Sequence, residues 1–141
     1  FIQDIMSKPK LLFRGPVETR SGYGSHSRDI LESLRAMDMF DFSIDSCNWG
    51  VTPLTALEDG NEFHQWIKKH KVLSIDAQPD VYVSVTISNE FRRVGKFNVG
   101  ITAGIETTVA GKDLIDGCNN MDLIIVPSNF TKDVYFQTVY K

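Results

Sequence analysis

Short, almost uninterrupted runs of apolar and β-branched residues constrain the fold of this chain more than any other feature. They lie at Asp80–Val85, Phe97–Thr102 and Asp122–Val126. Runs of this kind are typical of strands that are buried on both faces of a parallel sheet. Two weaker apolar segments, Leu11–Phe13 and Phe42–Cys47, indicate two more strands earlier in the chain.

The first of these strands leads into a glycine-containing loop and then into an amphipathic helix. The loop covers Ser21–Ser25, and its two glycines permit a tight turn and the close approach of a ligand. Ser25 is the expected N-cap, and one helical face carries Ile30, Leu31, Leu34 and Met37. Because the first N–H groups of a helix have no partners within it, this unit predicts an anion site. An ordinary βα turn, in which the glycines serve geometry alone, explains the same residues.

Three further helices are expected later in the chain. The first begins near Asp59, the second covers residues 112–119, and the third has Ser128 as its N-cap with Phe130 and Val134 facing inward. Strands that alternate with helices indicate a parallel sheet covered on both sides. We therefore predict a single α/β domain over all 141 residues. Its fold is a Rossmann-like doubly wound parallel sheet with helices on both faces.

Composition excludes several classes of function. The net charge is −3 and there is no long run of lysine or arginine, so we expect no binding to nucleic acid. No segment has the length and hydrophobicity of a membrane span, and the first residues do not resemble a signal peptide. Cys47 and Cys118 lie far apart without a CxxC or a histidine at ligand spacing. This favours buried thiols over a disulfide or a metal site and indicates the cytoplasm.

Polar residues follow the carboxyl ends of the predicted strands, which is where doubly wound sheets bind ligands. Beside the glycine loop these residues are His26, Ser88, Asn89, Thr102, Gly104 and Ser128. Their hydroxyl and amide groups suit a polar ligand that is rich in hydroxyls, although strand ends are also polar for solubility.

Two titratable residues at these ends have alternative roles. Glu106 follows a glycine-containing turn, where it can act as a general base, or it is a surface acid near a helix start. His26 can donate a hydrogen bond to an anion, or it is a solvated residue of the first helical turn. No nucleophile elbow, zinc-protease motif or Cys/His pair accompanies them.

Both ends of the chain resemble the amino-terminal domain of GT-B glycosyltransferases, in particular the retaining family 4 (group 1) transferases. Leu11–Met37 has the strand, the paired-glycine loop and the helix with which that domain opens. The segment DLIIVPSNFTKDVY, Asp122–Tyr135, is similar to the Asp-x-hydrophobic-hydrophobic-x-Pro-Ser-x-aromatic-Ser/Thr segment that closes it. The two segments have the order and separation found in the family, so the resemblance spans nearly the whole chain.

The resemblance implies an enzyme that moves a sugar from a nucleotide-sugar to an acceptor, which is a sugar, a lipid or a glycan. This domain would hold the acceptor, and a carboxyl-terminal domain would hold most of the donor. Contacts to the donor phosphates would fall to Gly22, Tyr23, Gly24 and Ser25. His26 and the polar residues at the other strand ends would contact the acceptor or the sugar. No metal and no cofactor besides the donor substrate are expected.

The chain departs from the family in two ways. Many members have a histidine after the middle strand, where this chain has Ala103–Glu106. Glu106 either supplies a polar or catalytic contact in its place, or the role is absent. The chain also ends at Lys141, before a donor domain with its Glu-x7-Glu signature. We therefore expect an incomplete enzyme that is inactive alone, with an apolar face that favours self-association.

Two other functions fit the same fold. One is a stand-alone Rossmann-like module that binds a small phosphorylated ligand without catalysis. The other is a different two-domain enzyme, such as a sugar-phosphate epimerase, because fold by itself does not determine activity.

Overall fold

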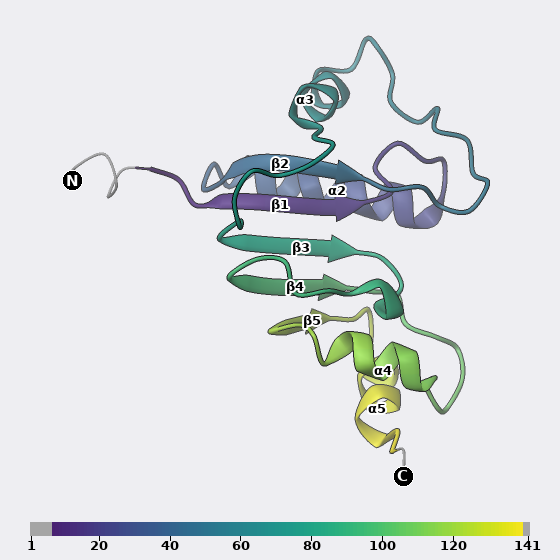
Figure 1. Cartoon of the computed structure of the whole chain (residues 1–141). Coiled ribbons are helices and arrows are strands. Elements are labelled where there is room, and N and C mark those ends of the chain that lie inside the picture. Colours follow the sequence, from purple (N-terminus) through teal and green to yellow (C-terminus); the bar gives the residue numbers. More distant parts are fainter. Residues whose placement is uncertain (1–6, 140–141) are drawn as a thin grey trace.

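Five parallel strands form the centre of the computed structural model, which describes residues 7–139. They lie side by side in the order β2-β1-β3-β4-β5 (Figure 1). The strands are β1 (Lys10–Gly15), β2 (Asp41–Ser46), β3 (Val81–Val85), β4 (Phe97–Ile101) and β5 (Leu123–Ile125). Each overlaps one of the apolar segments of the sequence, so the predicted strands are confirmed.

One further rung of parallel pairing lies beyond β2. Ile44 and Lys71 form an isolated bridge, and the Val72 N–H donates to the Ile44 carbonyl oxygen at 2.9 Å. Residues 71–72 thereby take the place of the third strand in the Rossmann order 3-2-1-4-5-6. The Rossmann-like α/β fold that the sequence predicts is confirmed.

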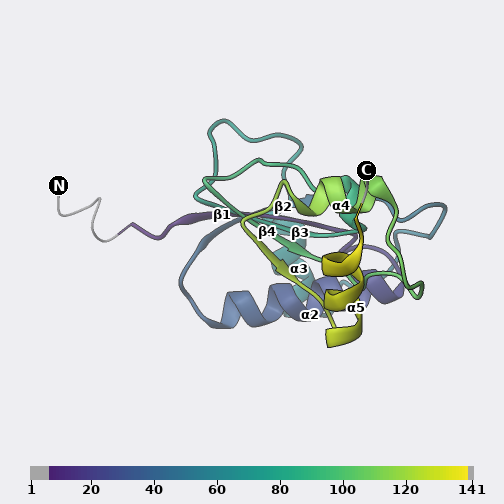
Figure 2. The ribbon, with the colours of Figure 1, turned by 90° about the horizontal axis from the view of Figure 1, so that it is seen from below.

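Helices lie on both faces of the sheet. α2 (Gly22–Ala36) and α4 (Lys112–Cys118) are on opposite faces (Figure 2). α3 (Glu62–His70) contributes to the same core as α2. A short 3-10 turn, η1 (Ser88–Glu90), packs against α4, and α5 (Asn129–Gln137) follows β5. Among the residues that the structure describes, no helix is long and apolar enough to cross a membrane.

The main core lies between the sheet and the pair α2 and α3. Strand register places Phe13 beside both Ile44 and Val83, so their side chains form one row on this face. Leu31 of α2 and Ile67 of α3 pack in the same cluster and are fully buried. Each such side chain stabilises the fold by about 1.5–3 kcal/mol. This half of the sheet therefore holds the strand ends in place.

The edge of the same face, at β5, is open. The apolar run at Asp122–Val126 predicts a strand buried on both faces, and this part of the prediction is wrong. β5 is the edge strand, and Leu123 and Ile125 are each 46% exposed. They lie in register with Val99 and Ile101 of β4. Leu123 and Ile125 stay exposed because α4 lies on the other face of the sheet and α2 packs over β1.

Two predicted details of the helices are also wrong. α2 begins at Gly22 and its N-cap is Ser21, whose Oγ accepts a hydrogen bond from the Gly24 N–H at 2.9 Å. The predicted N-cap, Ser25, therefore lies within the first turn. Met37 and Phe130, expected to face the core, are both exposed because they lie at or beyond the first or last turn of their helices. The predicted N-cap of α5, Ser128, is confirmed.

Candidate ligand-binding site

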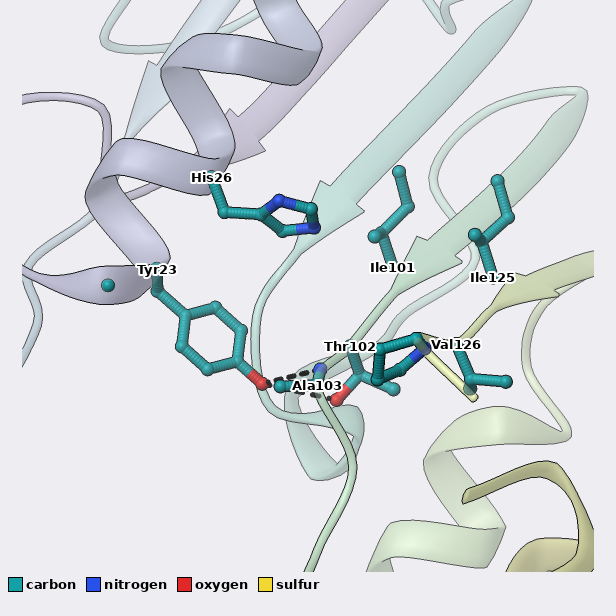
Figure 3. Close-up of a pocket in the computed structure, with 9 residues that line it drawn as sticks. Tyr23, His26, Ile101, Thr102, Ala103, Ile125 and Val126 are labelled. Atoms are coloured by element: carbon teal, nitrogen blue, oxygen red, sulfur yellow. Dashed lines mark hydrogen bonds between the residues drawn. The ribbon is translucent and has the colours of Figure 1, made fainter. Parts of the chain in front are cut away.

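A hollow of about 420 Å³ lies where the first turn of α2 meets the carboxyl ends of β4 and β5 (Figure 3). We call it the apolar hollow, and it is lined by Gly22, Tyr23, His26, Ile101, Thr102, Ala103, Ile125, Val126 and Pro127. Its volume lies in the range of about 300–1,000 Å³ that is usual for small-molecule sites. Five of the nine residues, including Ile101 and Ile125 from the strands, have aliphatic side chains.

The Tyr23 side chain joins three segments at the edge of this hollow. Its hydroxyl accepts a hydrogen bond from the Ala103 N–H at 2.9 Å and lies 3.3 Å from Thr102 Oγ1. Its ring stacks on Trp49, with the ring centroids 4.3 Å apart. Tyr23 thus fixes the loop after β4 and the loop after β2 to the start of α2. The sequence predicts a role for the Tyr23 backbone but not for its side chain, for which the place between two glycines is the one available signal.

His26 lies one turn further along α2, and its ring projects into the hollow opposite Ile101 (Figure 3). The side chain is exposed and makes no hydrogen bond to any other residue that the structure describes. Both ring nitrogens are therefore open to a ligand. A neutral imidazole offers one donor and one acceptor, which suits a hydroxyl group.

The first N–H groups of α2 form the polar end of the hollow. The Gly24 N–H is bound by Ser21 Oγ, and the Ser25 N–H donates to the Ser21 carbonyl at 2.9 Å. The Gly22 and Tyr23 N–H groups have no hydrogen-bond partner among residues 7–139. Free N–H groups at the positive end of a helix dipole favour an anionic or electron-rich group.

Gly22 and Gly24 have different structural roles in this turn. A Cβ on Gly24 would lie 2.2 Å from the Thr19 carbonyl oxygen, so this glycine allows the helix to pack against the preceding loop. A Cβ on Gly22 would meet nothing within 4 Å. Gly24 is therefore structural, and Gly22 leaves open space beside the free N–H groups.

A second hollow, of about 520 Å³, lies on the other side of the same turn. We call it the polar hollow, and it is lined by Arg20, Ser21, Gly22, Ser25, Arg28, Ala56, Glu58 and His64. The Arg28 guanidinium donates to the carbonyls of Val17 and Thr19, both at 2.9 Å. Burial, with a smaller contribution from the nearby Arg20, lowers the pKa of Arg28. Two close guanidinium groups make this hollow suitable for an anion.

The structure brings together only part of the predicted site. Gly22, Tyr23, His26 and Thr102 line the apolar hollow, and Gly22 and Ser25 line the polar one. The hydroxyl of Ser88 is buried and lies 3.3 Å from that of Tyr135, while Asn89 is an exposed residue of η1. Ser128 caps α5, and a Cβ on Gly104, whose φ is +79°, would lie 2.2 Å from Thr131. The last four residues line neither hollow.

Glu106, the predicted catalytic residue, lies on an exposed bend after β4. It lines neither hollow and makes no hydrogen bond or ion pair with another residue in the described part of the chain. Its role as a general base stays a prediction. Within residues 7–139 there is also no group of three or more His, Cys, Asp or Glu side chains that could hold a metal ion.

Comparison of the chain with protein-family models, with curated proteins and with solved structures found no match.

Proposed function

We propose that this chain is the acceptor-side domain of a GT-B glycosyltransferase, which transfers a sugar from a nucleotide-sugar to an acceptor hydroxyl. One observation carries the proposal: the first turn of α2 separates an apolar hollow from a polar, arginine-containing hollow. A transferase needs two such neighbouring sites, because the acceptor and the donor phosphates must meet at one point. The resemblance of both ends of the chain to this family supports the same assignment.

The polar hollow suits the leaving phosphates of the donor. The Arg20 and Arg28 guanidinium groups would stabilise the negative charge that develops on these oxygens, beside the positive end of the α2 dipole. Ser25 borders the same space. The apolar hollow would hold the acceptor, with a hydroxyl at His26. Glu106 has no step in this scheme, because it borders neither hollow.

A second domain, carried by a longer protein, would hold most of the nucleotide-sugar. The test is to determine the reading frame beyond the codon for Lys141 and to express all of it. We expect a second βαβ pattern with a Glu-x7-Glu pair, and release of nucleotide from a panel of UDP- and GDP-sugars. A frame without such a pattern, together with no nucleotide release, would contradict the proposal.

A non-catalytic module that binds a phosphorylated ligand is the second candidate, and the polar hollow favours it. This hollow is complete within one domain and needs no donor domain to bind an anion. Titration of the chain with glucose 1-phosphate separates the two candidates. Binding in the micromolar range by the chain alone favours the module, whereas the transferase predicts weak binding that strengthens only in the longer protein.

We also propose a cytoplasmic location for this domain. Cys47 and Cys118 are both free and partly buried, and burial raises the pKa of both thiols. Thiols with a raised pKa react slowly, which suits structural residues in a reducing compartment.

A further inference from the structure

The apolar hollow continues as an apolar strip along the open edge of the sheet at β5. Ile125 lines the hollow, Leu123 lies two residues before it on the same face of β5, and both are 46% exposed. Phe97, at the other end of β4, is 47% exposed. Strand register places Val99 beside Leu123 and Ile101 beside Ile125. Val99 is partly buried and Ile101 is only 8% exposed, so β5 and Phe97 supply most of the exposed apolar area. From Phe97 to Ile101 it extends about 13 Å, at about 3.3 Å per residue.

The polar groups that border the apolar hollow lie at one end of it. His26 and the free Gly22 and Tyr23 N–H groups lie at the carboxyl end of the strands, beside the hollow. The walls further from α2 are formed by Ile101, Ile125 and Val126 (Figure 3). A free sugar would place hydroxyls against these aliphatic groups and lose their hydrogen bonds to water, which is unfavourable. The surface therefore matches a ligand with one polar end and one apolar end.

We propose that the apolar hollow binds an acceptor that is an amphiphile, with its polar head at His26 and its apolar body along β4 and β5. That this ligand accepts a sugar rests on the proposed transferase function, whereas its amphiphilic character is inferred from the hollow alone. A hydroxyl on the head would lie at the turn of α2 that separates the two hollows. The donor phosphates would then lie on the other side of that turn.

Two glucosides with the same head test the proposal on the chain itself. Octyl β-glucoside, kept below its micelle concentration, carries an apolar body, and methyl β-glucoside lacks one. We expect the octyl compound to bind at least tenfold more tightly and to shift the NMR signals of His26 and Ile125. Equal affinity for the two glucosides, or shifts confined to residues outside the hollow, would overturn the proposal.

Matched variants separate this site from general adhesion to apolar surface. Ile125→Asp should weaken binding of octyl β-glucoside at least tenfold. Leu73→Asp, at an apolar side chain exposed far from the hollow, should leave it unchanged. His26→Ala, at an exposed helical residue, removes the imidazole from the polar end, keeps the apolar wall, and should weaken binding about threefold. It also serves as the second variant should Ile125→Asp fail to fold.

The strip could instead be covered by a second copy of this chain, and sedimentation velocity would detect such a dimer. A dimer that Ile125→Asp dissociates, combined with no binding of octyl β-glucoside, would overturn the proposal. Its failure is distinct from that of the transferase assignment. If the longer protein glycosylates water-soluble acceptors without preference, the transferase assignment is supported and the amphiphilic acceptor is overturned. If octyl β-glucoside binds but the longer protein transfers no sugar, the amphiphilic ligand is supported and the transferase assignment is overturned.

Discussion

The apolar hollow and the polar hollow share Gly22 and the first turn of α2, yet their walls differ in chemistry. The apolar hollow faces the sheet, so strand residues such as Ile101 and Ile125 supply its wall. The polar hollow faces loops and α3, so Arg20, Glu58 and His64 supply its opposite wall. The same helix terminus therefore borders two kinds of site. What packs opposite a helix end, rather than the end itself, decides which ligand it suits.

The largest expected effect is from Gly24→Ala, which disturbs both hollows at once. The new Cβ would lie 2.2 Å from a backbone oxygen, that of Thr19, which cannot move without shifting the loop. We expect a loss of about 3 kcal/mol in the free energy of unfolding, the upper end for overpacking. Urea denaturation followed by circular dichroism measures it.

Gly22→Ala is the matched control, because the same methyl group two residues earlier meets nothing within 4 Å. Its stability should stay within about 0.5 kcal/mol of the unaltered chain, as for most surface substitutions. Equal losses for the two variants would show that Gly24 is not a packing position.

Arg28→Met should affect the polar hollow and leave the apolar hollow intact. It removes the donors to the Val17 and Thr19 carbonyls while keeping much of the side-chain volume. Unsatisfied buried acceptors cost about 1–3 kcal/mol, so we expect a loss in that range. Binding of glucose 1-phosphate should fall and binding of octyl β-glucoside should not.

Arg20→Met provides the comparison, since Arg20 is exposed and, within residues 7–139, its side chain donates only to Thr55. It should weaken anion binding with almost no change in stability. A variant of Arg28 that binds both ligands normally would contradict the assignment of Arg28 to the polar hollow.

Glu18 makes the loop beside the polar hollow sensitive to acid. Burial raises its pKa, but hydrogen bonds from Lys71 and Ser46 outweigh this effect and hold the pKa of the carboxyl below its ordinary value of 4.5. A lowered pKa in the folded state means that ionised Glu18 stabilises the fold above about pH 4.5. This contribution is lost as the pH falls through the lower, folded pKa.

Thermal unfolding from pH 7 to pH 3 tests this expectation. Glu18→Gln should be less stable than the unaltered chain at neutral pH, and the difference should shrink as the pH falls below 4.5. Lys71→Met, which removes one of the two partners, should show part of the same pH dependence. A difference between Glu18→Gln and the unaltered chain that does not change with pH would refute the assignment.

The fold was predictable from sequence because buried parallel strands have a distinctive composition. The coverage of β5 was not predictable, because an apolar run such as Asp122–Val126 does not reveal which element packs on it. The helix start was misplaced for a related reason. Ser21 and Ser25 are both suitable caps, and glycines at positions 22 and 24 resemble a loop although they form the first turn.

The candidate site was predicted in part. Gly22, Tyr23, His26 and Thr102 lie together as the rule for strand ends predicts. The apolar wall was missed because Ile101 and Ile125 belong to strands that the sequence assigns to the core. The contacts of Arg28 were missed because its acceptors, the Val17 and Thr19 carbonyls, belong to a loop whose path the sequence does not reveal.

The smallest expected effect, from Tyr23→Phe, tests whether the apolar hollow is held open from its edge. The variant keeps the ring stacked on Trp49 and removes only the hydroxyl that accepts from the Ala103 N–H. One hydrogen bond contributes about 1 kcal/mol, so stability should fall by that amount or less. The loop after β4 would lose its attachment to α2, and the Ala103 amide should exchange with solvent markedly faster. Tyr82→Phe, which removes a hydroxyl that interacts with Ser84 within β3, should not change this exchange rate. If Ala103 exchanges at the same rate in Tyr23→Phe, the loop holds its position without Tyr23, and the wall of the hollow depends on the strands alone.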